Sequence, residues 1–435
     1  MVGRRSCQVL FPSSLSLLAL VACAPAGPAP VAPPPTAASA SPPVSASANA
    51  PDVPPGSFED DLAFLRAHGE VLVLEAPGGG RVALSAAYQG RVMTSTAEAG
   101  GASYGFVNRA FIEAGKTGTQ FDNYGGEDRF WLGPEAGPFG LYFAPGKPFA
   151  FAEWRTPDAF QAGAWTVKDR DARHVVFTRS FEVTNYAGTV LSMDVERTVR
   201  LLDADAVARH LGVAPGDGAR FVAFETENRI TNTGKVAWTK KGGLPSVWIL
   251  AMYDPSPDTF VVVPFDARAK GEVVNDRYFG KVPADRLQVN ENEGYLLFRC
   301  DGEHRSKIGL GPARARALLG SYSASARLLT IVHYDKPAGA TDYVNSMWET
   351  QKEPFGGDVV NSYNDGPTEP GKPSLGGFYE IETSSPAAAL APGGSLVHTH
   401  RTFHFVGAPS ALDPIAKRTL GLDTATLARG IAARP

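Results

Sequence analysis

The segment 125–135, Gly-Gly-Glu-Asp-Arg-Phe-Trp-Leu-Gly-Pro-Glu, concentrates acidic, basic and aromatic side chains between glycine-containing turns. A carboxylate next to a guanidinium stays ionised and holds ligand hydroxyl groups in a fixed geometry, and an indole ring can stack on an apolar ligand face. We expect Glu127 and Arg129 to share one strand face and Asp128 to point the other way. One interpretation makes Glu127 and Asp128 acid–base residues, with Arg129 and Trp131 binding the ligand. The other is that the Arg–carboxylate pair fastens the turn and that Trp131 fills the core.

Two further stretches carry charged groups at spacings that suit chemistry. Glu380 and Glu382 are two residues apart, so a strand would place both on one face, where they could work as an acid and a base. A solvated strand face is the alternative. Lys307 and His304 belong to the basic turn 301–307, which either contacts a substrate carboxylate or is solvated.

Three histidines have the same parity in the run 396–406, namely His398, His400 and His404. The pattern His-x-His on a strand is suited to metal binding, and either His398 or His400 could instead take part in acid–base catalysis. Because no second ligand motif is fixed by spacing, the sequence favours a polar strand face with one functional histidine. We therefore expect neither a metal nor another cofactor.

The segment 356–367 is rich in amide, hydroxyl and carboxylate groups. It contains Asn361, Tyr363, Asn364 and Asp365, followed by Gly-Pro. A loop of this composition can recognise sugar hydroxyls, but Asn-Asp-Gly-Pro is also good turn chemistry. We expect these four residues to contribute to a binding site at the rim of the same cleft.

Many short strands must position these residues. The clearest alternation lies in 191–201, where apolar residues occupy every second position except 197 and predict a half-buried strand. Helices are expected only after Ser57, over 203–211 and from Asp413, while 46 Gly and 35 Pro supply the turns. The sequence thus predicts an all-β fold, a large antiparallel β-sandwich with a few short peripheral helices. The sequence shows no repeat of fixed period, which argues against a propeller.

The N-terminus has the form of a bacterial lipoprotein signal. Residues 1–22 combine two arginines with an apolar stretch too short to span a bilayer, and Leu-Val-Ala precedes Cys23, the expected lipidation site. Residues 23–56 form a Pro/Ala/Ser-rich tether, and 57–435 are predicted to be one domain. A soluble exported protein is the alternative. Ala24 after the cysteine favours the outer membrane of a Gram-negative cell envelope.

The charge of the chain limits its partners. The formal net charge is -4, and it becomes more negative when the signal peptide with Arg4 and Arg5 is removed. A net negative domain is unsuited to nucleic acid or to an anionic membrane surface. We expect contact with the membrane only through the N-terminal lipid.

Five segments together resemble a family of bacterial secreted lipoproteins of uncharacterised function. They are 125–131, 274–280, 305–309, 358–366 and 379–386. The family is similar to the galactose-mutarotase-like (aldose-epimerase-like) β-supersandwich, which sugar epimerases share with domains of glycoside hydrolases and polysaccharide lyases. The resemblance implies a carbohydrate-facing cleft. The epimerases use a histidine acid and a glutamate base, and no motif in the middle of this chain supplies the histidine.

The sequence therefore predicts a lipid-anchored envelope protein with a carbohydrate-binding cleft. In one hypothesis it acts on a sugar or oligosaccharide by acid–base chemistry of epimerase, hydrolase or lyase type. Glu127, Asp128, Glu380 and one of His398 or His400 would then converge in one pocket. In the alternative hypothesis it is a non-catalytic glycan-binding or scaffold lipoprotein, and whether it is an enzyme stays open.

Overall fold

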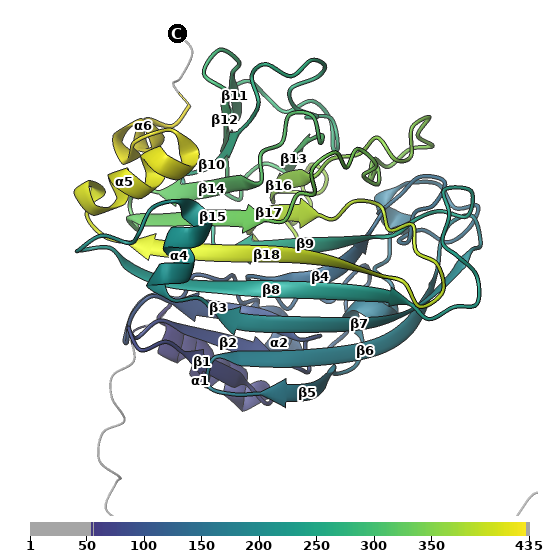
Figure 1. Cartoon of the computed structure of the whole chain (residues 1–435), viewed down its shortest axis with the longest axis horizontal. Helices are drawn as coiled ribbons and strands as arrows, with labels where there is room; N and C mark the ends of the chain where they lie inside the picture. Colours follow the sequence, from purple (N-terminus) through teal and green to yellow (C-terminus); the bar gives the residue numbers. More distant parts are fainter. Residues whose placement is uncertain (1–53, 55, 432–435) are drawn as a thin grey trace, which may run out of the picture. The chain divides into compact units, whose positions relative to one another are not determined.

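The structure is a computed structural model that describes residue 54 and residues 56–431 (Figure 1). The predicted signal peptide 1–22, the predicted lipidation site Cys23 and nearly all of the tether lie outside the described residues. Among the helices that the structure describes, none is both long and apolar enough to cross a membrane.

Strands dominate the described residues and form three antiparallel sheets. The ten-stranded sheet has the order β11 (Leu287–Asn290), β12 (Tyr295–Arg299), β10 (Thr259–Pro264), β14 (Leu318–Ser323), β15 (Leu328–Tyr334), β18 (Ser395–Val406), β8 (Arg220–Asn232), β7 (Val190–Leu201), β6 (His174–Thr184) and β5 (Thr166–Arg170). The five-stranded sheet has the order β13 (Ser306–Leu310), β16 (Val360–Asn364), β17 (Tyr379–Ser384), β9 (Ser246–Tyr253) and β4 (Arg129–Gly133). The small sheet consists of β1 (Leu72–Glu75), β2 (Arg81–Ser85) and β3 (Arg91–Thr96).

The helices are short. They are α1 (Phe58–His68), α2 (Arg109–Ala114), the 3-10 turn η1 (Phe151–Glu153), α3 (Asp158–Gln161), α4 (Ala204–Leu211), α5 (Pro409–Leu420) and α6 (Thr424–Arg429). Ser57 caps α1 by accepting a hydrogen bond from the Asp60 amide at 3.3 Å, as its position before the acidic first turn predicts. Helices α4, α5 and α6 pack against the outer face of the ten-stranded sheet, where Phe403 and Phe405 are buried.

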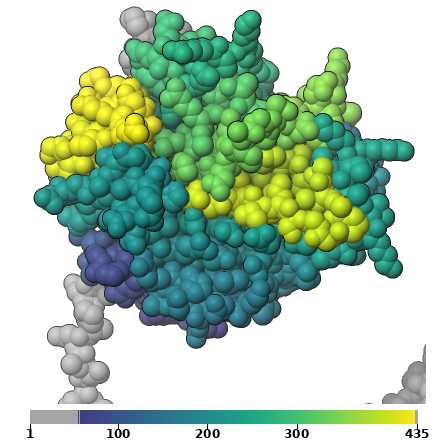
Figure 2. All heavy atoms as spheres, viewed as in Figure 1, coloured from purple at the N-terminus to yellow at the C-terminus, as the bar shows by residue number. Residues whose placement is uncertain are grey.

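The main core lies between the five-stranded and ten-stranded sheets. Apolar residues of β4, β9 and β17, such as Phe130, Ile249 and Ile381, face side chains of the larger sheet. In β7 every second residue is buried, as the alternation predicts, although Arg197 occupies one of these inward positions. The predicted antiparallel β-sandwich with few short helices is confirmed. In the space-filling view, the C-terminal strand and helices lie against segments from the middle of the chain (Figure 2).

Candidate functional site

The register of the five-stranded sheet places distant residues on one face. Arg129 of β4 lies opposite Leu250, which lies opposite Glu382 of β17. One row further along, Glu380 pairs with Tyr363, which pairs with Lys307 of β13. Because side chains alternate with a period of two, both rows project from the same face, away from the main core. The sequence prediction that Glu380 and Glu382 share a strand face is confirmed.

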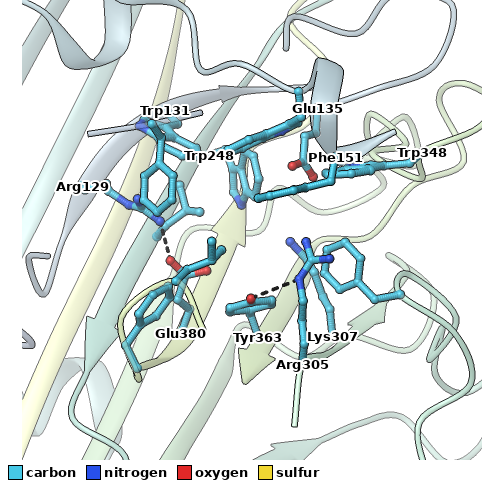
Figure 3. A pocket seen from close by; sticks show the side chains of 16 residues that line it. Arg129, Trp131, Glu135, Phe151, Trp248, Arg305, Lys307, Trp348, Tyr363 and Glu380 are labelled. Carbon is cyan, nitrogen blue, oxygen red and sulfur yellow. Dashed lines mark hydrogen bonds and ion pairs between the residues drawn. The ribbon is translucent and has the colours of Figure 1, made fainter. Parts of the chain in front are cut away.

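Arg129, Leu250, Glu380, Tyr363 and Lys307 of these rows form one wall of a cavity that opens to solvent (Figure 3). The opposite wall comes from loops that fold over the sheet, with Glu135, Phe151 and Trp348 facing Tyr363 and Glu380. Its lining consists of nine aromatic, five charged and two aliphatic side chains, namely Phe121, Trp131, Phe151, Trp154, Trp248, Phe279, Trp348, Tyr363, Phe378, Arg129, Glu135, Arg305, Lys307, Glu380, Leu250 and Leu375.

Arg129 and Glu380 are joined at the floor of this cavity. Arg129 Nη2 donates a hydrogen bond to Glu380 Oε1, and the guanidinium carbon lies 4.2 Å from the centre of the Trp131 ring. Both side chains are almost completely buried. Burial raises the pKa of Glu380 to about 8, although Arg129 opposes this shift. A carboxyl group with this pKa keeps its proton at neutral pH and can give it up to a bound molecule.

A second buried pair lies beside the first. Lys307 Nζ is 2.8 Å from Glu382 Oε2, which also accepts a hydrogen bond of 2.9 Å from the Trp248 indole. Burial opposes the charge on Lys307, but Glu382 and Glu135 outweigh it and raise the pKa of Lys307. Lys307 therefore stays protonated at the cavity wall, where its charge is paired with Glu382.

Arg305 and Glu135 complete the charged lining. Arg305 lies over the Phe279 ring at 3.8 Å, and its Nε is 3.4 Å from the Tyr363 hydroxyl. Burial raises the pKa of Glu135, which comes from the loop after β4 and faces the cavity from the other wall (Figure 3). Two carboxyl groups with raised pKa thus line one cavity from different elements.

The residues of the predicted loop 356–367 have mostly structural contacts. Asn361, Tyr363 and Asn364 belong to strand β16, so the expectation that they lie in a loop is wrong. Tyr363 lines the cavity, whereas the Asn361 amide donates to the Tyr278 hydroxyl at 3.0 Å. Asn364 binds the backbone of the 302–304 turn. Asp365 accepts hydrogen bonds from the Tyr363 hydroxyl at 2.9 Å and from two backbone amides, and so fixes the Tyr363 ring.

Glu127 and Asp128 lie on the core side of the sheet. Glu127 accepts a hydrogen bond of 2.5 Å from Ser95 and lies 3.1 Å from His404 Nε2. Asp128 is bound by Arg197 at 2.6 Å. The expectation that Glu127 and Arg129 share a face is wrong, because regular alternation begins only at Arg129. The chain bends just before it, at Glu127.

The conformation of Gly126 explains why the chain can turn there. Its φ of +111° lies in a region that side chains rarely adopt, and a Cβ would come within 2.3 Å of Arg91 Cδ. The bend separates the charged segment into core-facing acids and a cavity-facing arginine.

The three histidines also face the core. His398, His400 and His404 share one face of β18, as predicted, and all are buried. Thr383 Oγ1, on the core face of β17, lies 2.9 Å from His398 Nε2 and 2.9 Å from His400 Nδ1. Glu380 points to the opposite face of β17, so the expected convergence of Glu380 with these histidines, Glu127 and Asp128 does not occur. Within residues 54 and 56–431, no group of three or more His, Cys, Asp or Glu is placed to hold a metal ion.

Of the sequence-predicted residues, the structure brings Arg129, Trp131, Lys307, Tyr363 and Glu380 together at the cavity. Sequence reasoning missed several other members, among them Glu135, Phe151, Trp154, Trp248, Phe279, Arg305 and Trp348. The tryptophans carry the signal that could have found some of them. Only six occur in the chain, and four of these line the cavity.

Several solved structures are similar in fold. A candidate aldose 1-epimerase from Escherichia coli K12 is 11% identical, and the match covers 78% of this chain and 99% of that chain with a TM-score of 0.48. A galactose mutarotase-like protein from Lactobacillus casei is 9% identical over 77% of this chain and 100% of that chain, with a TM-score of 0.41. A galactose mutarotase related enzyme from Lactobacillus acidophilus is also 9% identical, over 77% and 97%, with a TM-score of 0.41.

The likeness to these solved structures concerns the fold alone. Residues 56–430 match the family of unknown function DUF6786, and the chain belongs to this family. No curated protein matches the chain in sequence.

Proposed function

We propose that the cavity on the five-stranded sheet binds a carbohydrate. The observation that carries this proposal is its lining, in which nine aromatic side chains surround five charged ones. Aromatic rings stack on the apolar faces of sugar rings, and charged groups bind their hydroxyls with fixed geometry. Three of the rings, Phe151, Phe279 and Trp348, are partly exposed; Arg305 lies over Phe279, and Phe151 and Trp348 are proposed to stack on the sugar.

We further propose that the bound sugar undergoes acid–base chemistry in this cavity. Glu380 and Glu135 supply the proton-transfer groups, because burial raises the pKa of both carboxyl groups. Tyr363, held by Asp365, is a neutral hydroxyl beside them, since burial raises its pKa well above the ordinary value. The alternative is a binding protein that uses the same cavity without turnover. The Glu380→Gln variant distinguishes this alternative from an enzyme.

The location of the protein is a proposal from the sequence. The signal-like residues 1–22 and Cys23 support a lipid anchor, and the Pro/Ala/Ser-rich segment to residue 56 supports a tether between anchor and domain. We propose that the cavity is thereby presented to glycans of the cell envelope.

Trp348 provides the test of sugar binding. We expect Trp348→Ala to weaken binding of mono- and oligosaccharides by about ten-fold or more, because a stacking surface is lost. Titration of the intrinsic tryptophan fluorescence and calorimetry measure the affinity. Tyr88→Ala is the matched control, since Tyr88 is a partly buried aromatic residue that stacks on Tyr124 outside the cavity.

Wild-type affinity in Tyr88→Ala together with weakened binding in Trp348→Ala supports the proposal. Absence of binding across a panel of neutral and acidic sugars, with a wild-type protein that is folded by circular dichroism, contradicts it.

A further inference from the structure

The charges of the cavity are unevenly matched. Arg129 is bound to Glu380, and Lys307 is bound to Glu382. Arg305 forms no ion pair with any residue that the structure describes, and its only side-chain partner there is the neutral Tyr363 hydroxyl. The guanidinium is thus a cation at the cavity wall without a direct ion pair among the described residues, and Glu135 on the opposite wall is an acidic group close enough to interact with its charge.

Arg305 is nevertheless held in a defined position. Its guanidinium carbon lies 3.8 Å from the centre of the Phe279 ring, 5.4 Å from that of Phe151 and 5.9 Å from that of Trp348. Cation–π contacts of this kind orient the planar group without neutralising it. The Tyr363 hydroxyl is in turn fixed by Asp365. The remaining N–H groups of the guanidinium fork stay available for a ligand at the cavity.

Buried hydrogen-bond donors without partners also indicate a ligand with acceptor groups. Arg129 Nε and Nη1 and the indole nitrogens of Trp131 and Trp154 have no hydrogen-bond partner within residues 54 and 56–431. All three side chains line the cavity and are more than nine-tenths buried. A buried donor that stays unpaired is costly, so this lining suits a ligand rich in acceptor oxygens.

The acidic residues of the cavity do not cancel its preference for a ligand rich in acceptor oxygens. Burial raises the pKa of Glu380 to about 8, so this carboxyl group is mostly protonated at neutral pH, and burial also raises the pKa of Glu135. The cavity is lined by three basic side chains, Arg129, Arg305 and Lys307, and by two acidic ones, Glu135 and Glu380.

From these contacts we infer that the sugar bound in the cavity is acidic and carries a carboxylate, as a hexuronate does, and that Arg305 binds this carboxylate through its guanidinium fork. A carboxylate accepts two parallel N–H bonds from such a fork, and its oxygens can also take up neighbouring donors. This inference rests on the proposed carbohydrate-binding function and names the class of sugar. Arg305 is thus a specificity-determining residue of the site.

The test compares matched neutral and acidic sugars on the purified full chain. D-galactose is paired with D-galacturonate and D-glucose with D-glucuronate, together with the trisaccharides of each and D-galactose 6-sulfate. Affinities are measured by tryptophan fluorescence and calorimetry. In at least one pair we expect the uronate to bind about ten-fold more tightly than its neutral partner. Arg305→Gln should remove this preference, because it should weaken binding of the uronate about ten-fold more than binding of the neutral sugar.

Two variants control for charge and shape. Arg305→Lys keeps the charge but loses the fork, so it should retain only part of the preference. Arg229→Gln removes a half-exposed arginine from β8, outside the cavity, and should retain all of it.

Equal binding of uronate and neutral sugar, equal weakening of both by Arg305→Gln, or tighter binding of the sulfate ester than of the uronate overturns the inference. In each of these cases a sugar still binds and the proposed function stands. If no sugar in the set binds to the folded protein, the proposed function and this inference both fall.

Discussion

Three physical effects determine the pKa of Glu380. Its side chain is buried, it is bonded to Arg129, and Glu382 lies two residues away on the same strand face. Burial is the largest effect and raises its pKa to about 8, and Glu382 acts in the same direction while Arg129 opposes it. The carboxyl group is therefore protonated below about pH 8 and ionised above it.

This pKa gives a prediction for catalysis. If Glu380 donates a proton, turnover should fall as the pH rises through about 8, because the proton is then lost. Glu380→Gln should leave sugar affinity within about three-fold of wild type and abolish turnover. Exchange between sugar anomers or bond cleavage is followed by NMR on the sugars that bind.

Glu113→Gln is the matched control, because Glu113 is exposed on α2 outside the cavity. Turnover that survives in Glu380→Gln removes this residue from the chemistry. A wild-type protein that binds sugars but never turns them over supports the glycan-binding alternative.

At the scale of single residues, the sequence predicted which residue types belong to the site better than it predicted the direction in which each side chain points. Arg129, Trp131 and Glu380 could be chosen because charge and aromatic area were concentrated around them, and they do line the cavity. Glu127 has the same parity as Arg129, yet the bend at Glu127 turns it into the core. The face to which a side chain points can be predicted only where the strand is regular. The sequence does not show at which residue regular strand pairing starts.

The histidines of strand β18 belong to the core of the sandwich and not to the cavity. His398 and His400 face the core, and Thr383 binds both. Burial lowers the pKa of His398 to about 3 and that of His400 to about 4. Both imidazoles therefore remain neutral inside the folded protein over most of the acid range.

The stability of the fold should consequently depend on pH. Below the ordinary pKa of 6.5 the unfolded chain binds protons at these histidines and the folded chain does not, so acid favours unfolding. The free energy of unfolding should be independent of these groups above about pH 7. It should fall as the pH decreases from 6.5 toward 4, by up to about 1.4 kcal/mol per pH unit for each histidine. Urea unfolding between pH 4 and 8 measures this.

His400→Gln should reduce the slope, and His68→Gln, which changes an exposed residue of α1, should not. An unchanged slope in His400→Gln would show that other groups control the acid sensitivity.

At the scale of the whole molecule, the cavity depends on two kinds of structure. The five-stranded sheet supplies the charged wall through its register, and long connections supply the aromatic wall that faces it. Glu135, Phe151 and Trp154 come from the connection between β4 and β5, and Trp348 comes from that between β15 and β16. Hydrophobic alternation predicts strands and hence the sandwich, but it contains no information on which loop folds over which sheet face. The fold was therefore predictable, while most of the residues that line the cavity were not.

The attachment of the whole molecule to a membrane is the last prediction. The motif Leu-Val-Ala-Cys ends the signal-like segment, so we expect the full chain to acquire lipid at Cys23 and to partition into the detergent phase of Triton X-114. Cys23→Ser should shift the protein to the aqueous phase and prevent incorporation of labelled palmitate, because one hydroxyl replaces the acylated thiol. Cys300→Ala is the control, since Cys300 is buried in the domain and is inaccessible to acylation. Retention of Cys23→Ser in the detergent phase would contradict the anchor. Its release with unchanged sugar affinity would show that the lipid and tether place the cavity without forming it.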